Sequence, residues 1–160
     1  MAIIGMRTGN GSVGRGRDER GAVAVEFAFV VLPLMVMFFG IMGFGFLFSQ
    51  QLALSHGARE AARFASVASY NNNSWVPRTC SEVEARAREA AQSMAIPDTS
   101  KVAVAVTRSD GSCGSPGVCS GAASSTSVKV RLDYDSGLVL PFLPWDGKVS
   151  AEGVFRCEYS

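Results

Sequence analysis

The chain has 160 residues and a formal net charge of +1, so no surplus of either sign indicates nucleic acid or an acidic substrate as a partner. This length accommodates one membrane helix and one small domain, and small domains often need covalent support. The only histidine, His56, lies close to the long apolar segment. A Ser-His-Asp or Cys-His arrangement in the rest of the chain is therefore excluded. We expect no enzymatic activity, no catalytic residues, no cofactor and no small-molecule substrate.

The N-terminal part of the sequence indicates a membrane anchor. No charged side chain occurs from Phe27 to Phe48. About 22 helical residues span about 33 Å, close to the roughly 30 Å hydrocarbon thickness of a bilayer. A removable secretory signal has a much shorter apolar region. Arginines precede the segment, which predicts a cytoplasmic N-terminus and an extracytoplasmic C-terminal part at the cell membrane. These arginines are Arg7, Arg15, Arg17 and Arg20.

Glu26 stands directly before the apolar segment, and it allows two interpretations. It can be an interfacial residue of an ordinary signal anchor, held among the lipid headgroups. Alternatively, the Gly21–Ala22 bond is a processing site whose cleavage creates an α-amino group at Ala22, one helical turn from Glu26. That amine, on the same or a neighbouring subunit, could neutralise the carboxylate inside a helix bundle. We favour the second interpretation because the glycine, the arginines and the glutamate occur together.

Two sequence blocks carry a resemblance to a known family. The string G-A-V-A-V-E-F-A-F-V-V-L-P, from Gly21 to Pro33, resembles the N-terminus of type IV pilin-like proteins, most closely the TadE-like minor pilins of tight-adherence (Flp-type) pilus systems. A similar alanine–arginine stretch, A-R-E-A-A-R-F-A, follows from Ala58 to Ala65. The resemblance covers about residues 20–65, and residues 66–160 show no family motif.

The resemblance implies a minor pilin or pseudopilin that takes part in pilus assembly. It implies cleavage after Gly21 by a prepilin peptidase, which removes a leader peptide, 1–21. Glu26 then acts in assembly together with Phe27 and Pro33. The implied partners are the prepilin peptidase, other pilins, pilus-assembly membrane proteins and the lipid bilayer. The alternative is an uncleaved, single-pass anchored envelope protein whose outer domain binds another protein or a surface.

The helix is predicted to continue past the membrane, so that residues 22–69 form one long helix. There is no proline between Gln50 and Val67, and one face is apolar at helical spacing. This face consists of Leu54, Ala58, Ala61 and Ala65, and the adjoining side carries Leu52, His56, Arg59 and Arg63. Glu60 is placed to pair with Arg63 or His56.

A polar loop around Tyr70 and Trp75 is expected to lead to a second helix. Ser81 and Glu84 match a capping box, and Pro97 is expected to end the run. The predicted buried stripe is Val83, Ala87, Ala90 and Met94. The charged pairs Glu82–Arg86 and Glu84–Arg88 fit the exposed face.

Beyond Pro97 the apolar period becomes two, which predicts three strands. Their inward residues are Val102, Val104 and Val106, then Val128, Val130, Leu132 and Tyr134, then Val149, Ala151, Gly153, Phe155 and Cys157. The Gly/Ser-rich stretch 108–126 is expected to be an exposed, flexible loop. The apolar segment 138–145, which contains two prolines, fits either core or a contact patch, and we favour core.

All four cysteines follow the apolar segment, which indicates disulfides in an outer domain. Three pairings are possible, and we favour Cys113–Cys119, which closes the short loop, with Cys80–Cys157, which joins the second helix to the last strand. No Cys-x-x-Cys pair is present, so no metal site is expected. The predicted fold is α+β: a long N-terminal helix followed by a small domain, 70–160, with one helix on an antiparallel sheet of about three strands.

Overall fold

The computed structural model describes residues 15–113, 116–123, 125–137 and 147–158. The chain divides at Gly40–Ile41 into an N-terminal unit and an outer unit, Ile41–Ser160. The elements are α1 (Arg15–Ser66), β1 (Ser69–Asn71), β2 (Ser74–Val76), α2 (Cys80–Ala91), the 3-10 helix η1 (Thr99–Lys101), β3 (Val102–Arg108), β4 (Gly111–Ser112), β5 (Ser127–Asp135) and β6 (Lys148–Arg156). The α+β prediction is confirmed.

The helix α1 continues through the apolar segment and into the outer unit, as the sequence predicts, but it ends at Ser66 and not at residue 69, where β1 begins. Pro33 lies inside it without ending it. The predicted apolar face is confirmed, because Leu54, Ala58, Ala61 and Ala65 are all fully buried. The polar side is exposed at His56, Arg59 and Arg63. The second half of α1 is therefore a core element of the outer unit.

The main sheet has four antiparallel strands in the order β4-β3-β5-β6. Three of them are the predicted strands, and β4 adds two residues that pair with the end of β3. The inward side chains on β5 are buried as expected, at Val128, Val130, Leu132 and Tyr134. Phe155 departs from the prediction, since it is 37% exposed at the end of β6. The opposite face carries cross-strand ion pairs, including Lys129–Glu152 at 3.3 Å.

The helix α2 begins two residues earlier than its predicted cap implies. The capping box is formed by Thr79 and Glu82, not by Ser81 and Glu84. Thr79 has the extended backbone that an N-cap residue needs, with φ −80° and ψ 158°, whereas Ser81 is already inside the helix.

The predicted buried stripe of α2 is also wrong at its C-terminal end. Val83 and Ala87 are buried, but Ala91 continues the stripe and Met94 is fully exposed. The helix ends at Ala91, before Pro97, and a bridge between Ser93 and Ile96 turns the chain. The side chain of Ile96 is thereby buried in the core where Met94 was expected.

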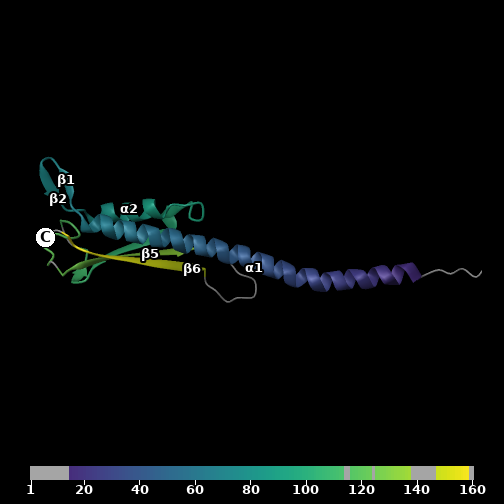
Figure 1. Cartoon of the computed structure of the whole chain (residues 1–160). Helices are drawn as coiled ribbons and strands as arrows, with labels where there is room; N and C mark the ends of the chain where they lie inside the picture. The colour runs from purple at the N-terminus through teal and green to yellow at the C-terminus, as the bar shows by residue number, and fades with distance from the viewer. Residues whose placement is uncertain (1–14, 114–115, 124, 138–146, 159–160) are drawn as a thin grey trace, which may run out of the picture. The chain divides into compact units, whose positions relative to one another are not determined.

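Both helices pack against the inward face of the sheet, and they run side by side (Figure 1). Two glycines allow the close approach. A Cβ on Gly57 would lie 2.8 Å from the Cβ of Ala91 on α2. A Cβ on Gly153 of β6 would collide with the backbone of Ala58 on α1. The core is therefore built from α1, α2 and the sheet together.

Two segments expected to be loops have more structure. Around Tyr70 the chain forms a hairpin, in which β1 pairs with β2. Asn72 and Asn73 provide its turn with positive φ values of 48° and 65°, a conformation that asparagine tolerates better than most residues. The stretch 108–126 is not simply exposed, because Val118 and Cys119 are fully buried. The apolar segment 138–145 lies outside the described residues.

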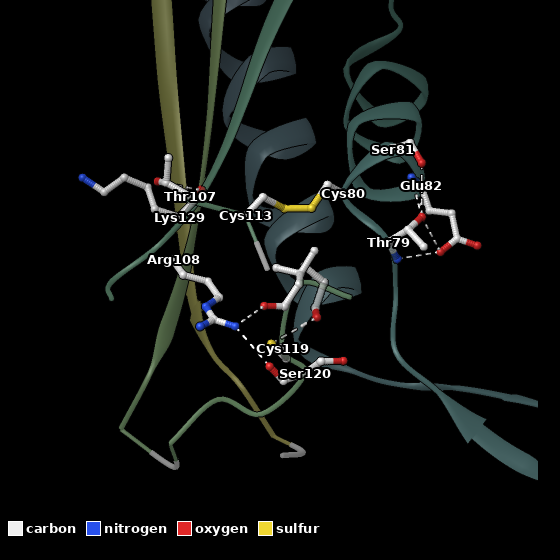
Figure 2. Close-up of a disulfide and its surroundings, with 12 residues drawn as sticks. Thr79, Cys80, Ser81, Glu82, Thr107, Arg108, Cys113, Cys119, Ser120 and Lys129 are labelled. Carbon is white, nitrogen blue, oxygen red and sulfur yellow. Dashed lines mark hydrogen bonds between the residues drawn. A yellow bond between two sulfur atoms is a disulfide. The ribbon is translucent and has the colours of Figure 1, made fainter. Parts of the chain in front are cut away.

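Two disulfides are present, but the favoured pairing is wrong. The bonds join Cys80 to Cys113 and Cys119 to Cys157. The strand β4 pairs back onto β3 and brings Cys113 to the start of α2 (Figure 2). Cys119 is directed inward, where its Sγ lies 3.5 Å from the carbonyl oxygen of Ala65. Each bond therefore ties distant parts of the fold, and neither closes the short 113–119 loop.

Candidate assembly segment

The candidate site is the N-terminal part of α1, which the sequence singles out by Gly21, Ala22, Glu26, Phe27 and Pro33. Within the described residues, one helical stretch, Gly21–Ser66, is long and apolar enough to cross a membrane. Its side chains in the first half are exposed, including Phe27 at 66%. Such a surface is stable only against lipid or other apolar helices.

Gly21 has no structural role that the chain itself reveals. A Cβ at this position would meet no atom within 4 Å. A glycine in the interior of a helix costs about 1 kcal/mol relative to alanine. Gly40 and Gly45 are equally free of neighbours. What distinguishes Gly21 is its place before Ala22 and five residues before Glu26.

Glu26 is exposed on α1, and its carboxylate has no hydrogen bond or ion pair among the residues that the structure describes. At 3.6 residues per turn, Ala22 lies about 40° from Glu26 around the helix, and Pro33 about 20° from it. These three residues therefore share one side of α1. Phe27 lies about 100° away and faces another direction.

An apolar hollow lies along α1 from Ala24 to Pro33, and Glu26 is not part of its lining. It is lined by Ala24, Val25, Ala28, Phe29, Leu32 and Pro33. Ala24 and Ala28 are four residues apart, which is the small-xxx-small spacing that lets a second helix approach closely. The hollow therefore suits packing by another apolar helix.

A second surface feature, at the end of α1, was missed by the sequence analysis. Trp75 on β2 is 71% exposed, and its ring lies edge-on to that of Tyr70 at a centroid distance of 5.0 Å. An open groove beside it is lined by Val67, Ala68, Trp75, Pro77, Ser120 and Glu158. The signal was the Asn72–Asn73 pair between two aromatic residues, which is typical of a tight hairpin.

The loop that forms one wall of this groove is held firmly. Arg108 donates hydrogen bonds to the carbonyl oxygens of Val118 and Ser120, at 3.4 and 3.2 Å (Figure 2). Its guanidinium also pairs with Asp110 at 2.6 Å. This ion pair raises the pKa of Arg108 and lowers the pKa of the Asp110 carboxyl. Arg108 thus joins the end of β3 to this wall of the groove.

No cluster of three or more His, Cys, Asp or Glu side chains that could hold a metal is found in the described part of the chain. Its four cysteines are all engaged in disulfides. From Gly21 to Phe48, Glu26 is the only charged residue.

Residues 21–63 match the family described as TadE-like protein, which confirms the resemblance of this segment. The match begins at Gly21 and includes most of the alanine–arginine stretch that ends at Ala65. No curated protein and no solved structure matches the chain.

Proposed function

Because residues 21–63 are TadE-like, we propose that the protein is a minor pilin or pseudopilin that takes part in the assembly of Flp/Tad-type pili. It is inserted in the cell membrane by the apolar segment of α1, with its N-terminus in the cytoplasm and the chain beyond Phe48 outside. A prepilin peptidase cleaves it after Gly21. Its role is structural and not enzymatic.

The observation that carries this proposal is the carboxylate of Glu26, which has no partner among the described residues and is the only charged group from Gly21 to Phe48. On the insertion scale a carboxylate costs about 2.5–3.5 kcal/mol at the centre of a membrane helix, and this value is the upper bound for Glu26 at the start of the apolar segment. Cleavage after Gly21 creates an amine at Ala22 on the same side of α1. Pairing between that amine and Glu26, within one subunit or between neighbours, recovers this cost most fully in a bundle of low dielectric constant.

The apolar hollow supports the next step, in which α1 leaves the bilayer and joins other helices. Ala24 and Ala28 present little side-chain volume, so a neighbouring pilin helix can pack closely there. Phe27 and Phe29 supply exposed apolar area next to them. Pro33 removes a backbone hydrogen bond and allows a local adjustment of the helix during packing.

The proposed topology rests on two independent features. The arginines before the apolar segment favour a cytoplasmic N-terminus. Disulfides form in oxidising compartments, and both bonds of this chain lie in the outer unit.

Processing is tested with Gly21→Leu, because a site made for glycine should not accept a bulky side chain. We expect mass spectrometry to find Ala22 at the N-terminus of the parent protein and an uncleaved chain in the variant. Gly40→Leu is the matched control, since Gly40 also lies on α1 with no atom within 4 Å of a Cβ. A mature N-terminus at Ala22 in Gly21→Leu would remove the main support for peptidase recognition.

The role of Glu26 is tested separately with Glu26→Gln, which keeps the shape of the side chain and removes its charge. Membrane level and cleavage should stay near normal, while the yield of sheared pili falls. If the residue is only interfacial, the change is silent or aids insertion. Normal piliation would therefore favour a permanent anchor.

The permanent anchor is the second candidate, and the exposed Trp75 and Tyr70 favour it. Such a protein keeps its leader and uses the outer unit to bind another protein or a surface. The mature N-terminus separates the two: Ala22 supports the pilin, and Met1 or Ala2 supports the anchor.

A further inference from the structure

The outer unit carries a groove between α1 and β6 that the proposed assembly through the N-terminal part of α1 does not use. We call it the α1–β6 groove and define it by Leu52, His56, Arg59, Glu60, Arg63 and Phe155, which line it. Its ends are apolar, since Leu52 is 55% exposed and Phe155 is 37% exposed. Its middle is basic.

No described residue forms an ion pair with the two arginines of the groove, Arg59 and Arg63. The sequence suggests that Glu60 pairs with Arg63, but the Glu60 carboxylate forms an ion pair with Arg86 of α2 at 3.1 Å instead. Arg59 and Arg63 therefore have no ion pair among the described residues. Most other cations of the outer unit do, for example Arg88 with Glu84 and Arg131 with Asp133.

A lipid surface does not suit this groove. Arg59 follows Phe48, the last residue of the uncharged segment, by about 11 residues, or about 16 Å of helix. The headgroup layer on each side of the hydrocarbon core is only about 5–8 Å thick. The arginines thus lie beyond the reach of headgroups when the uncharged segment fills the membrane.

A second copy of this chain does not suit it either. On α2, Glu84 is paired with Arg88 and Glu89 with Arg86. The carboxylate of Glu82 accepts hydrogen bonds from Thr79. No exposed helix in the described outer unit therefore offers two free carboxylates.

Arg59 and Arg63 are four residues apart, so their side chains are neighbours on one face of α1. Two carboxylates at the same spacing on a second helix can meet both guanidinium groups. An apolar side chain on that helix would cover Leu52 or Phe155. We propose that the α1–β6 groove binds an amphipathic helix of a different protein, which carries two carboxylates one turn apart beside an apolar residue.

The test places a photo-crosslinking amino acid at His56 in the full-length membrane-bound chain, irradiates the cells and sequences the crosslinked peptide. We expect a peptide of another protein with acidic residues at i and i+4. Arg59→Glu with Arg63→Glu should reduce the adduct about tenfold or more, because like charges then face each other. Arg59→Lys with Arg63→Lys should retain most of it.

The matched control is Lys101→Glu with Lys129→Glu, which changes the net charge equally at exposed sites outside the groove. Circular dichroism checks that every variant is folded. The adduct should also form in Gly21→Leu, because the groove lies in the outer unit. Its presence there, without processing, separates this inference from the proposed function. The inference is overturned if no adduct forms at His56 or if the adduct is with a second copy of the chain. It is also overturned if the adduct persists in Arg59→Glu with Arg63→Glu.

Discussion

At the scale of single residues, Thr79 and Glu82 decide where α2 begins. The Glu82 N–H donates to the Thr79 hydroxyl at 3.3 Å, and the Thr79 N–H donates to the Glu82 carboxylate at 2.8 Å. The sequence alone contains a competing match at Ser81 and Glu84. Which match forms the cap depends on backbone conformation. A capping residue has an extended backbone just before the helix, so that its side chain accepts from the free N–H groups of the first turn, and Thr79 but not Ser81 is in this position.

Thr79→Ala should therefore lower the free energy of unfolding of the outer unit by about 1 kcal/mol. Ser81→Ala is the control, and it should have a smaller effect because the Ser81 hydroxyl lies 3.2 Å from the Thr79 hydroxyl and accepts from no backbone N–H among the described residues. Chemical denaturation of the full-length chain in detergent measures both. Equal losses in the two variants would contradict the observed cap.

The same box has a pH dependence with a definite sign. The pKa of Glu82 lies below its ordinary value, chiefly because the Thr79 N–H donates to the carboxylate and then because the Thr79 hydroxyl does. A lowered pKa stabilises the fold above the ordinary carboxyl pKa, and this contribution is lost as pH falls through the folded-state pKa. The stability difference between the parent and Glu82→Gln should thus be present at neutral pH and shrink in acid.

At the scale of elements, α1 is both an apolar segment and a core helix. The sequence predicts both roles, since the run from Phe27 has no charge and the face from Leu54 to Ala65 has helical spacing. The two-residue period of the strands was equally readable. The sequence could not predict which elements contact each other. Nothing in the sequence distinguishes Gly57 and Gly153 from other glycines, yet each lies where two elements approach too closely for a side chain.

Gly153→Ala should destabilise the outer unit by about 1–3 kcal/mol, because the new methyl group meets backbone atoms of α1 that cannot move aside. The reduced entropy of the unfolded chain offsets only part of this loss. Val154→Ala, on the open face of the same strand, is the control and should stay within about 0.5 kcal/mol. Thermal melts followed by circular dichroism compare them. An unchanged melt for Gly153→Ala would argue against the packing of β6 on α1.

At the scale of the whole molecule, the candidate site could be predicted from the sequence, whereas the pairing of the disulfides could not. The candidate site from Gly21 to Pro33 lies within one helix, so its residues could be proposed from their spacing along the chain alone. The disulfides join residues 33 and 38 positions apart, and the pairing depends on where β3 and β4 turn back. Four cysteines allow three pairings, and chain distance favoured the wrong one. Tertiary folding, which brings Cys119 beneath α1, selects another.

Closing loops of this length stabilises a fold by about 4 kcal/mol in the chain-entropy treatment, against about 2 kcal/mol for the short 113–119 loop. The double variant Cys119→Ser with Cys157→Ser should therefore lose several kcal/mol of unfolding free energy and keep the bond between Cys80 and Cys113. If the native bonds were Cys113–Cys119 and Cys80–Cys157, the same variant would lose both and leave Cys80 and Cys113 as free thiols. Non-reducing peptide mapping decides the pairing directly. Trypsin leaves Cys113 and Cys119 in one fragment, 109–129, so a second digestion with elastase is needed to cut after the small residues between them. We expect Cys80 linked to Cys113 and Cys119 linked to Cys157. A direct Cys113–Cys119 link, or a Cys80–Cys157 link, would show that the outer unit closes in a different way from the one described.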